Sequence, residues 1–285
     1  MKNIIFHFTI IIALYSCSSD AETKTTIPAN DNYVIVLDLS DRIIQKPDQV
    51  NIDTSAIRAV FEKFEKSVHK NIVVKSKDKF SIRIIPQKLS SLPGNAFENN
   101  LSIDMGKYTA AEKLIKLNQF RANFSLQLGL LYQQALLGNK NSDFAGVDVW
   151  QYFNEQVNSD LDIRYNNKVI VLTDGYFDFE DRKHGIKSNS QSSTTAPLLS
   201  KMNGLNWKKE VAEKQLGIIP VKLNTPAKWL VCGIQPKAKS DDLLEAEKLS
   251  YLWEQWLRDS GGTQILKPII NSSSEKVKNL ILNNL

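Results

Sequence analysis

The sequence has few of the residues that cross-link a small exported protein or build a metal site from nitrogen and sulfur ligands. Its 285 residues include two cysteines and three histidines. His69 and His184 have no partner at the spacing of metal ligands, so we interpret both as surface residues. Cys232 lies in the apolar run Trp229-Leu-Val-Cys232-Gly and is expected to be a small buried strand residue. Stability must therefore come from a packed core rather than from disulfides.

Several catalytic and nucleic-acid-binding signatures are also absent. The chain contains no D-x-D-x-T phosphatase signature, no G-x-S-x-G elbow, no P-loop and no G-x-G-x-x-G. A net charge of +5 arises from 36 basic and 31 acidic residues spread along the chain. We interpret this charge as solvated surface and expect no nucleic-acid partner. With 42% hydrophobic residues, the composition is that of an ordinary globular protein.

Residues 1–16 have the order of a signal peptide. A short basic start, Met1-Lys2-Asn3, precedes an apolar run from Ile4 to Leu14. This run is too short to span a bilayer, which takes about 20 residues. It leads into Leu-Tyr-Ser-Cys17, which resembles the bacterial lipoprotein signal and implies that Cys17 is lipidated and becomes the mature N-terminus. An ordinary secretory signal with an incidental cysteine is the alternative.

The segment after the cysteine is polar. Residues 17–31 are rich in Thr, Asp and Ala and predict a flexible tether from the membrane. The stretch Ser18-Ser-Asp20-Ala-Glu22 resembles the acidic export tag of surface-exposed lipoproteins in some Gram-negative bacteria. These resemblances imply an outer membrane lipoprotein of the bacterial cell envelope, on the periplasmic or the surface-exposed face.

Strands and helices alternate along the rest of the chain. This order predicts an α/β fold with a doubly wound, mostly parallel sheet flanked by helices, over residues 32–285. Little periodicity is visible near 178–226, which predicts a long insertion, and Lys183 to Gly204 is expected to be exposed because it is rich in Ser, Thr and Asn. The predicted strands are 33–38, 80–85, 168–172, 229–234 and 263–266. The predicted helices follow Asp53 as a cap and cover 109–117, 124–137, 147–157, 241–258 and 275–282.

Two of these predicted strands end in an aspartate. Val34-Ile-Val-Leu is followed by Asp38-Leu-Ser40-Asp41-Arg42, and Val169-Ile-Val-Leu is followed by Thr173-Asp174-Gly175. Both runs have the β-branched content of strands that are buried on both faces. In an open parallel sheet, ligands bind where such strands give way to loops. The two loops therefore form the candidate site.

The pairing of D-x-S with T-D-G resembles the von Willebrand factor A domain, in which these loops form a metal-ion-dependent adhesion site. In that family a middle loop supplies a threonine as a further ligand. The resemblance implies that Asp38, Ser40 and Asp174 hold a divalent cation, Mg²⁺ or Mn²⁺. Ser125, which we expect to open a helix with Gly129 four residues on, takes the place of the threonine.

Arg42 departs from the family pattern, because it stands where the family has its second serine. A guanidinium only donates hydrogen bonds and cannot ligate a cation. At about 4 Å from a divalent ion, its repulsion would be on the order of several kcal/mol at an effective dielectric near 20. Two alternatives follow. Arg42 points outward, drawn by Asp41, and the cation binds; or Arg42 replaces the cation and pairs with Asp38 or Asp174.

Two functional classes are consistent with these loops. The resemblance implies a lipid-anchored binding module that recognises a protein partner through the loops after the first and fourth strands. The alternative is a metal-dependent hydrolase with Asp38 and Asp174 as ligands. No histidine falls near either acid at ligand spacing, and the hydrolase signatures are absent. We therefore expect a binding protein and not an enzyme.

Substitution of Cys17 by serine should release the protein from membranes, because the lipidated N-terminus is the hydrophobic attachment that the sequence predicts. Detergent-phase partitioning measures this: the wild type should enter the detergent phase and Cys17→Ser the aqueous phase. Ser18→Ala serves as the matched control and should behave as the wild type. A Cys17→Ser variant that still enters the detergent phase would contradict the lipoprotein assignment.

Overall fold

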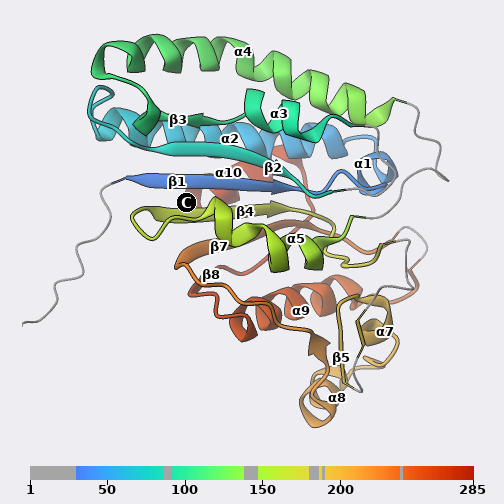
Figure 1. The fold of residues 1–285 in the computed structure, drawn as a ribbon. Coiled ribbons are helices and arrows are strands. Elements are labelled where there is room, and N and C mark those ends of the chain that lie inside the picture. The colour runs from blue at the N-terminus through green and yellow to red at the C-terminus, as the bar shows by residue number, and fades with distance from the viewer. Residues whose placement is uncertain (1–29, 87–91, 138–146, 180–185, 188–189, 238–239) are drawn as a thin grey trace, which may run out of the picture.

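A computed structural model describes residues 30–86, 92–137, 147–179, 186–187, 190–237 and 240–285 of the chain (Figure 1). Its centre is a seven-stranded sheet with the strand order β3-β2-β1-β4-β7-β8, and β9 also pairs with β7. Every pairing in this sheet is parallel except that of β2 with β3. The strands are β1 (Asp31–Leu37), β2 (Lys79–Ile84), β3 (Ile103–Asp104), β4 (Asn166–Leu172), β7 (Ala227–Ile234), β8 (Gln264–Ile265) and β9 (Ile269–Ile270).

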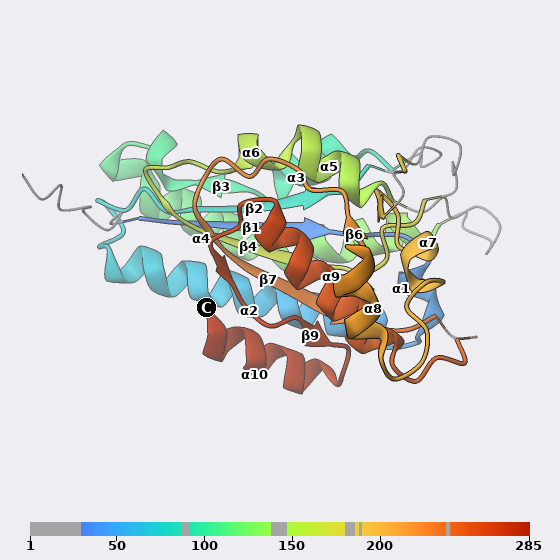
Figure 2. The ribbon, with the colours of Figure 1, turned by 90° about the horizontal axis from the view of Figure 1, so that it is seen from below.

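Helices cover both faces of the sheet, as the alternating pattern predicts (Figures 1 and 2). On one face lie α2 (Gln49–Lys70), α4 (Ala110–Leu136) and α10 (Ser274–Asn284), and α10 packs against α2. On the other face lie α5 (Val149–Glu155), α6 (Val157–Asp160) and α9 (Glu245–Asp259). Two short helices, α1 (Arg42–Gln45) and α3 (Gly94–Asn100), follow β1 and β2, and the 3-10 turn η1 (Met105–Lys107) follows β3. The fold is thus the predicted doubly wound α/β fold.

β1 and β4 occupy the middle of the sheet and are buried on both faces, which explains their unbroken apolar sequences. In β1, Ile35 and Leu37 face the core under α2, whereas Val34 and Val36 face the core under α9. From this central pair the sheet continues to β2 on one side and to β7 on the other. The boundary between β1 and β4 is therefore the topological switch point, where doubly wound sheets bind ligands.

The predicted pair of helices at 109–117 and 124–137 is wrong, because one helix, α4, runs without a break through both. No glycine or proline interrupts residues 118–123. Phe120 and Phe124 also hold this stretch against the sheet, since both rings contact Phe61 of α2 and Phe80 of β2. Aromatic packing from other elements thus stabilises a central turn that sequence periodicity alone does not mark.

The insertion near 178–226 is more ordered than its composition indicates. β5 (Gln191–Ser192) pairs with β6 (Gly217–Ile218), and α7 (Ala196–Leu199) and α8 (Trp207–Lys214) lie between them in sequence. The expected exposure of Lys183 to Gly204 is wrong for residues 192–195, which are buried. The hydroxyls of Ser192 and Thr194 bond to each other, Thr195 donates to Asp178, and Ser193 accepts from the Ile186 amide. Residues 180–185 and 188–189 lie outside the described part of the chain.

The N-terminal predictions fall almost entirely outside the described residues, which begin at Asn30. The signal peptide at 1–16 and Cys17 therefore remain predictions. The tether was expected to extend to residue 31, but Asp31 already belongs to β1, where its carboxylate accepts a 2.6 Å hydrogen bond from Lys168. Within the described residues, no helix combines the length and apolar character needed to cross a bilayer.

Candidate functional site

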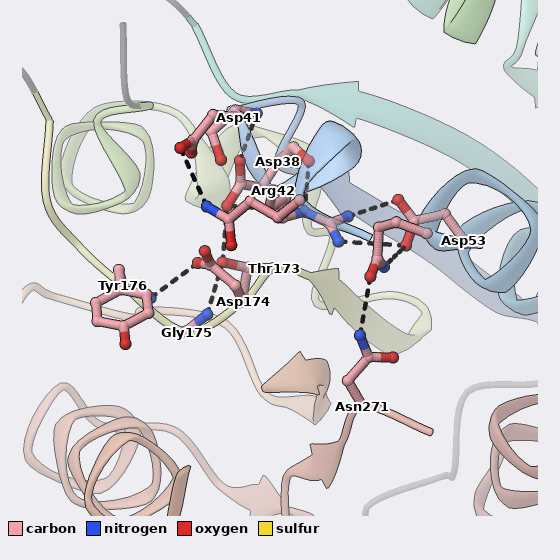
Figure 3. A network of polar contacts seen from close by, with 12 residues as sticks. Asp38, Asp41, Arg42, Asp53, Thr173, Asp174, Gly175, Tyr176 and Asn271 are labelled. Atoms are coloured by element: carbon pink, nitrogen blue, oxygen red, sulfur yellow. Dashed lines mark hydrogen bonds and ion pairs between the residues drawn. The ribbon is translucent and has the colours of Figure 1, made fainter. Parts of the chain in front are cut away.

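The loops after β1 and β4 begin at the same level of the sheet (Figure 3). The Asp38 amide donates to the Leu172 carbonyl oxygen, and the Thr173 amide donates to the Cys232 carbonyl oxygen, each at 3.0 Å. The Asp38 carboxylate lies between the two loops: Oδ1 accepts from the Ser40 amide and Oδ2 from the Thr173 hydroxyl, both at 2.8 Å. Both carboxylate oxygens of Asp38 are therefore used in joining the loops, and its side chain is buried.

Arg42 points into the protein, not outward. Its side chain is 0% exposed. Nε donates to the Asp38 carbonyl oxygen at 2.8 Å, and Nη1 and Nη2 donate to the two carboxylate oxygens of Asp53 at 3.3 and 2.7 Å (Figure 3). Burial opposes the charge of the guanidinium, but the carboxylates of Asp53 and Asp38 outweigh that effect and raise the pKa of Arg42 above its usual value.

The expected partners of Arg42 were Asp38 or Asp174, and this prediction is correct only for a secondary contact. Nε lies 3.9 Å from Oδ2 of Asp38, whereas the bidentate ion pair is made with Asp53. Asp53 was expected to cap a helix, but α2 begins at Gln49 and places Asp53 inside its second turn. Asp53 lies four residues before Ile57, so extending the apolar periodicity of this helix backwards puts an acid on the core face.

Asp53 connects Arg42 with side chains of α2 and α4. Its carboxylate also accepts hydrogen bonds from Gln49 Nε2 and from the Tyr132 hydroxyl of α4, both at 2.9 Å. Gln49 accepts in turn from Asn271 Nδ2 at 2.8 Å, and Asn271 donates to Gln235 Oε1 at 2.6 Å. Side chains from α2, α4 and the segments after β7 and β9 thus converge behind the loops.

A glycine in β7 allows this close approach. Gly233 has φ +102°, and a Cβ there would lie 2.8 Å from the Thr173 carbonyl oxygen and 3.9 Å from Nη1 of Arg42. Any other residue would push apart the loop after β4 and the guanidinium, or would strain the backbone.

Asp174 is the least satisfied carboxylate of the site. Its side chain is buried; Oδ1 accepts from the Tyr176 amide at 3.2 Å, and no described residue donates a hydrogen bond to Oδ2. Burial and the nearby carboxylate of Asp38 raise the pKa of Asp174 to about 8. This carboxyl therefore takes up a proton more readily than an ordinary aspartate, and the proton reduces the repulsion between the two acids.

The loop after β4 is fixed by contacts with α9. Trp253 Nε1 donates to the Gly175 carbonyl oxygen at 3.0 Å, and the Tyr176 hydroxyl donates to Glu245 Oε1 at 2.6 Å. The Tyr176 oxygen also accepts from the Lys237 amide at 3.0 Å, which ties in the loop after β7. The side chains of Asp41 and Lys237 are exposed at the rim of the site, and the Lys237 ammonium lies 3.8 Å from Oδ2 of Asp178.

Ser125 is not part of the site, which corrects its prediction as the middle ligand. It lies inside α4 and is exposed. The side chain of α4 that reaches the site is Tyr132, roughly two helical turns further along. The structure brings together Asp38, Ser40 and Asp174, whereas Ser125 lies apart from them.

The donor set around these loops does not fit a divalent cation. Mg²⁺ and Mn²⁺ require several oxygen ligands, but the Asp38 carboxylate is already oriented by the Ser40 amide and the Thr173 hydroxyl. The Arg42 guanidinium places a permanent positive charge 3.9 Å from the same carboxylate. Among the described residues, no group of three or more His, Cys, Asp and Glu side chains is arranged to hold a metal. The geometry thus favours the alternative in which Arg42 replaces the cation.

Comparisons with known proteins give distant likenesses. No family model and no curated protein matches the sequence. Two structures of the pilus adhesin SpaC from Lactobacillus rhamnosus GG, one in an open conformation, match 91% of this chain at 11% identity, with TM-scores of 0.41 and 0.42. Proximal thread matrix protein 1 of the mussel byssus matches 88% of this chain at 10% identity, with a TM-score of 0.31. The chain spans 30% of the adhesin and 46% of the byssus protein. The fold is therefore assigned from its own sheet topology.

Replacing Arg42 with methionine should lower the free energy of unfolding by about 3–5 kcal/mol, because the buried carboxylate of Asp53 loses its counter-charge. The double variant Arg42→Met/Asp53→Asn should recover much of this loss. Lys66→Met removes an ion pair of the same 2.7 Å length at the surface and should cost less than about 1 kcal/mol. Urea unfolding measures all three. Equal losses for Arg42→Met and Lys66→Met would contradict the central role of Arg42.

Ionisation of Asp174 should oppose folding as the pH rises. The folded chain holds this proton more tightly than the unfolded chain, whose carboxyl has the ordinary pKa of 3.8, so stability falls between about pH 4 and the folded pKa of about 8. Asp174→Asn cannot ionise and should raise the unfolding midpoint at alkaline pH, with little effect near pH 4. Thermal unfolding across this range measures the difference. A stabilisation that is largest in acid would contradict this assignment.

Proposed function

We propose that the protein is a lipid-anchored binding module of the bacterial cell envelope, related to von Willebrand factor A domains, which recognises a protein partner through the loops after β1 and β4. In this proposal the Arg42 guanidinium does the structural work of the cation. The observation that carries it is the placement of Asp38, Ser40 and Asp174 at the switch point of the sheet. Thr173 and Asp38 join the two loops there, and Arg42 and Asp53 fix the first loop to α2.

A rigid rim supports binding as the role of this site. The loops are already fixed by hydrogen bonds from Thr173, Tyr176 and Trp253. Their conformational entropy would therefore fall little when a partner binds. The exposed side chains of Asp41 and Lys237 offer charges of opposite sign at the rim. Such charges select a complementary partner surface more than they add affinity.

The alternative, a metal-dependent hydrolase, has less support. It requires Asp38 and Asp174 to ligate a metal, yet the Arg42 guanidinium lies 3.9 Å from the Asp38 carboxylate, where it opposes a second positive charge. Cys232, behind the loops, is a poor nucleophile because burial raises the pKa of its thiol. We therefore propose that the protein acts by binding and not by catalysis. Anchoring through Cys17 rests on the sequence and places the module on the periplasmic or the surface-exposed face of the outer membrane.

Reversing the charge of Asp41 should weaken partner binding roughly tenfold or more if the rim is the contact surface. The purified protein would be used to capture partners from envelope extracts, with and without chelator. The matched control is Asp259→Arg, because Asp259 is also exposed but lies at the far end of α9 from Glu245. A species retained by the wild type and by Asp259→Arg, lost with Asp41→Arg and unaffected by chelator supports the proposal. Retention by Asp41→Arg would refute it.

Direct titration separates the two functional classes. Calorimetry of the wild type with Mg²⁺ or Mn²⁺ should give no heat of binding, because Arg42 occupies the inner side of the loops. Phosphoesterase and peptidase assays of the same preparation should give no metal-dependent activity. Stoichiometric metal binding together with metal-dependent turnover would overturn the binding proposal and favour the hydrolase.

A further inference from the structure

Among the described residues, the outer face of α4 carries exposed apolar side chains. α4 forms the outermost layer of its side of the molecule (Figure 1). Its inner face buries Leu117, Phe124 and Leu128, as expected for a helix packed on a sheet. On the opposite face, Leu126 and Leu137 are 61% and 60% exposed. Exposed leucines at helical spacing are unusual on a helix that already buries one apolar face.

These residues belong to one line of positions along the helix, the outer stripe, which runs from Ile115 to Leu137. Ile115, Leu126 and Leu137 follow an eleven-residue repeat, or about 3.67 residues per turn, so they lie in a nearly straight row. The turns between them carry Gln119 and Gln133, and both are exposed. The outer stripe contains no charged residue, and its two glutamines are neutral.

The outer stripe is also symmetric about Leu126. Four residues away on either side stand Ala122 and Leu130, a small residue and a large one. Seven residues away on either side stand glutamines, and eleven residues away stand Ile115 and Leu137. Reversing the direction of the stripe therefore places a small side chain opposite a large one, amide opposite amide, and apolar opposite apolar.

From this symmetry we infer that α4 is the interface of a homodimer, in which the outer stripes of two copies pack antiparallel about a two-fold axis through Leu126. A two-fold interface requires a surface that complements itself, and the outer stripe has that property. Ala122 leaves room for Leu130 of the partner subunit, so the helices can approach closely. The Gln119 amide can bond that of Gln133 of the partner subunit, which satisfies polar groups that a purely apolar partner surface would leave unpaired.

The dimensions predict a reversible dimer. The outer stripe is about 33 Å long at 1.5 Å per residue and about 10–12 Å wide, which is roughly half the surface that a standard stable interface buries on each partner. Because the interacting groups are apolar and neutral, the association should depend little on ionic strength. The loops after β1 and β4 are not part of this surface, since α4 contacts the site through the inward-facing Tyr132.

Sedimentation velocity of the purified chain over a range of micromolar concentrations tests the inference. The wild type should shift from monomer to dimer as concentration rises. Leu126→Glu brings two carboxylates together on the two-fold axis and should weaken association roughly tenfold or more. The matched control is Leu114→Glu, the same change at a 51% exposed leucine about 120° around the helix, which should dimerise as the wild type does.

Paired substitutions test the antiparallel register. Gln119→Glu with Gln133→Lys puts opposite charges across the interface at both ends and should tighten the dimer, more so at low salt. Gln119→Glu with Gln133→Glu opposes like charges and should loosen it. A wild type that stays monomeric at all concentrations overturns the inference. A dimer whose affinity Leu126→Glu leaves unchanged also overturns the inference. The same holds if the two paired glutamine variants change the dimer affinity equally. Circular dichroism of each variant, unchanged from the wild type, establishes that the effects arise at the interface.

Discussion

The buried ion pair between Arg42 and Asp53 is the constraint on which the site depends. A guanidinium without contact with water is costly unless its donors are met, and here Asp38 and Asp53 accept from it. This requirement fixes the loop after β1 against α2. Through Tyr132 and Gln49 it also determines where α4 and the segment after β9 lie. The ion pair lies beneath the carboxyl ends of β1 and β4. The shape of the candidate site therefore depends on the hydrogen bonds and the counter-charge that the buried Arg42 guanidinium requires.

A covalently attached positive charge differs from a bound cation in its consequences. A metal can leave an open coordination position for a partner's carboxylate, whereas the Arg42 donors are already used by Asp38 and Asp53. The charge is present at all metal concentrations, so the loops need no cation to be held together. In the proposed binding role, recognition would therefore depend on the rim charges and not on metal supply.

Much of the fold was accessible from the sequence because it depends on local pattern. Continuous β-branched runs predicted β1 and β4, and the alternation of strands with amphipathic helices predicted the doubly wound sheet. Errors arose where tertiary packing outweighed local signals. Phe120 and Phe124 pack on Phe61 and turn two predicted helices into one, and residues 192–195 are buried although their composition indicates a loop. Neither effect is visible in the spacing of one segment alone.

The sequence alone determined that Asp38, Ser40 and Asp174 would meet at one edge of the sheet, because parallel strands present their carboxyl ends together. It also raised the question of Arg42, since a guanidinium cannot ligate a metal. Only the tertiary structure decided the answer. Asp53 lies 11 residues along the chain from Arg42 and Tyr132 lies 79 residues beyond Asp53, and folding brings all three into one buried network. Ser125 was excluded by its position along α4: it is exposed and lies about two helical turns before Tyr132, the residue of this helix that reaches the site.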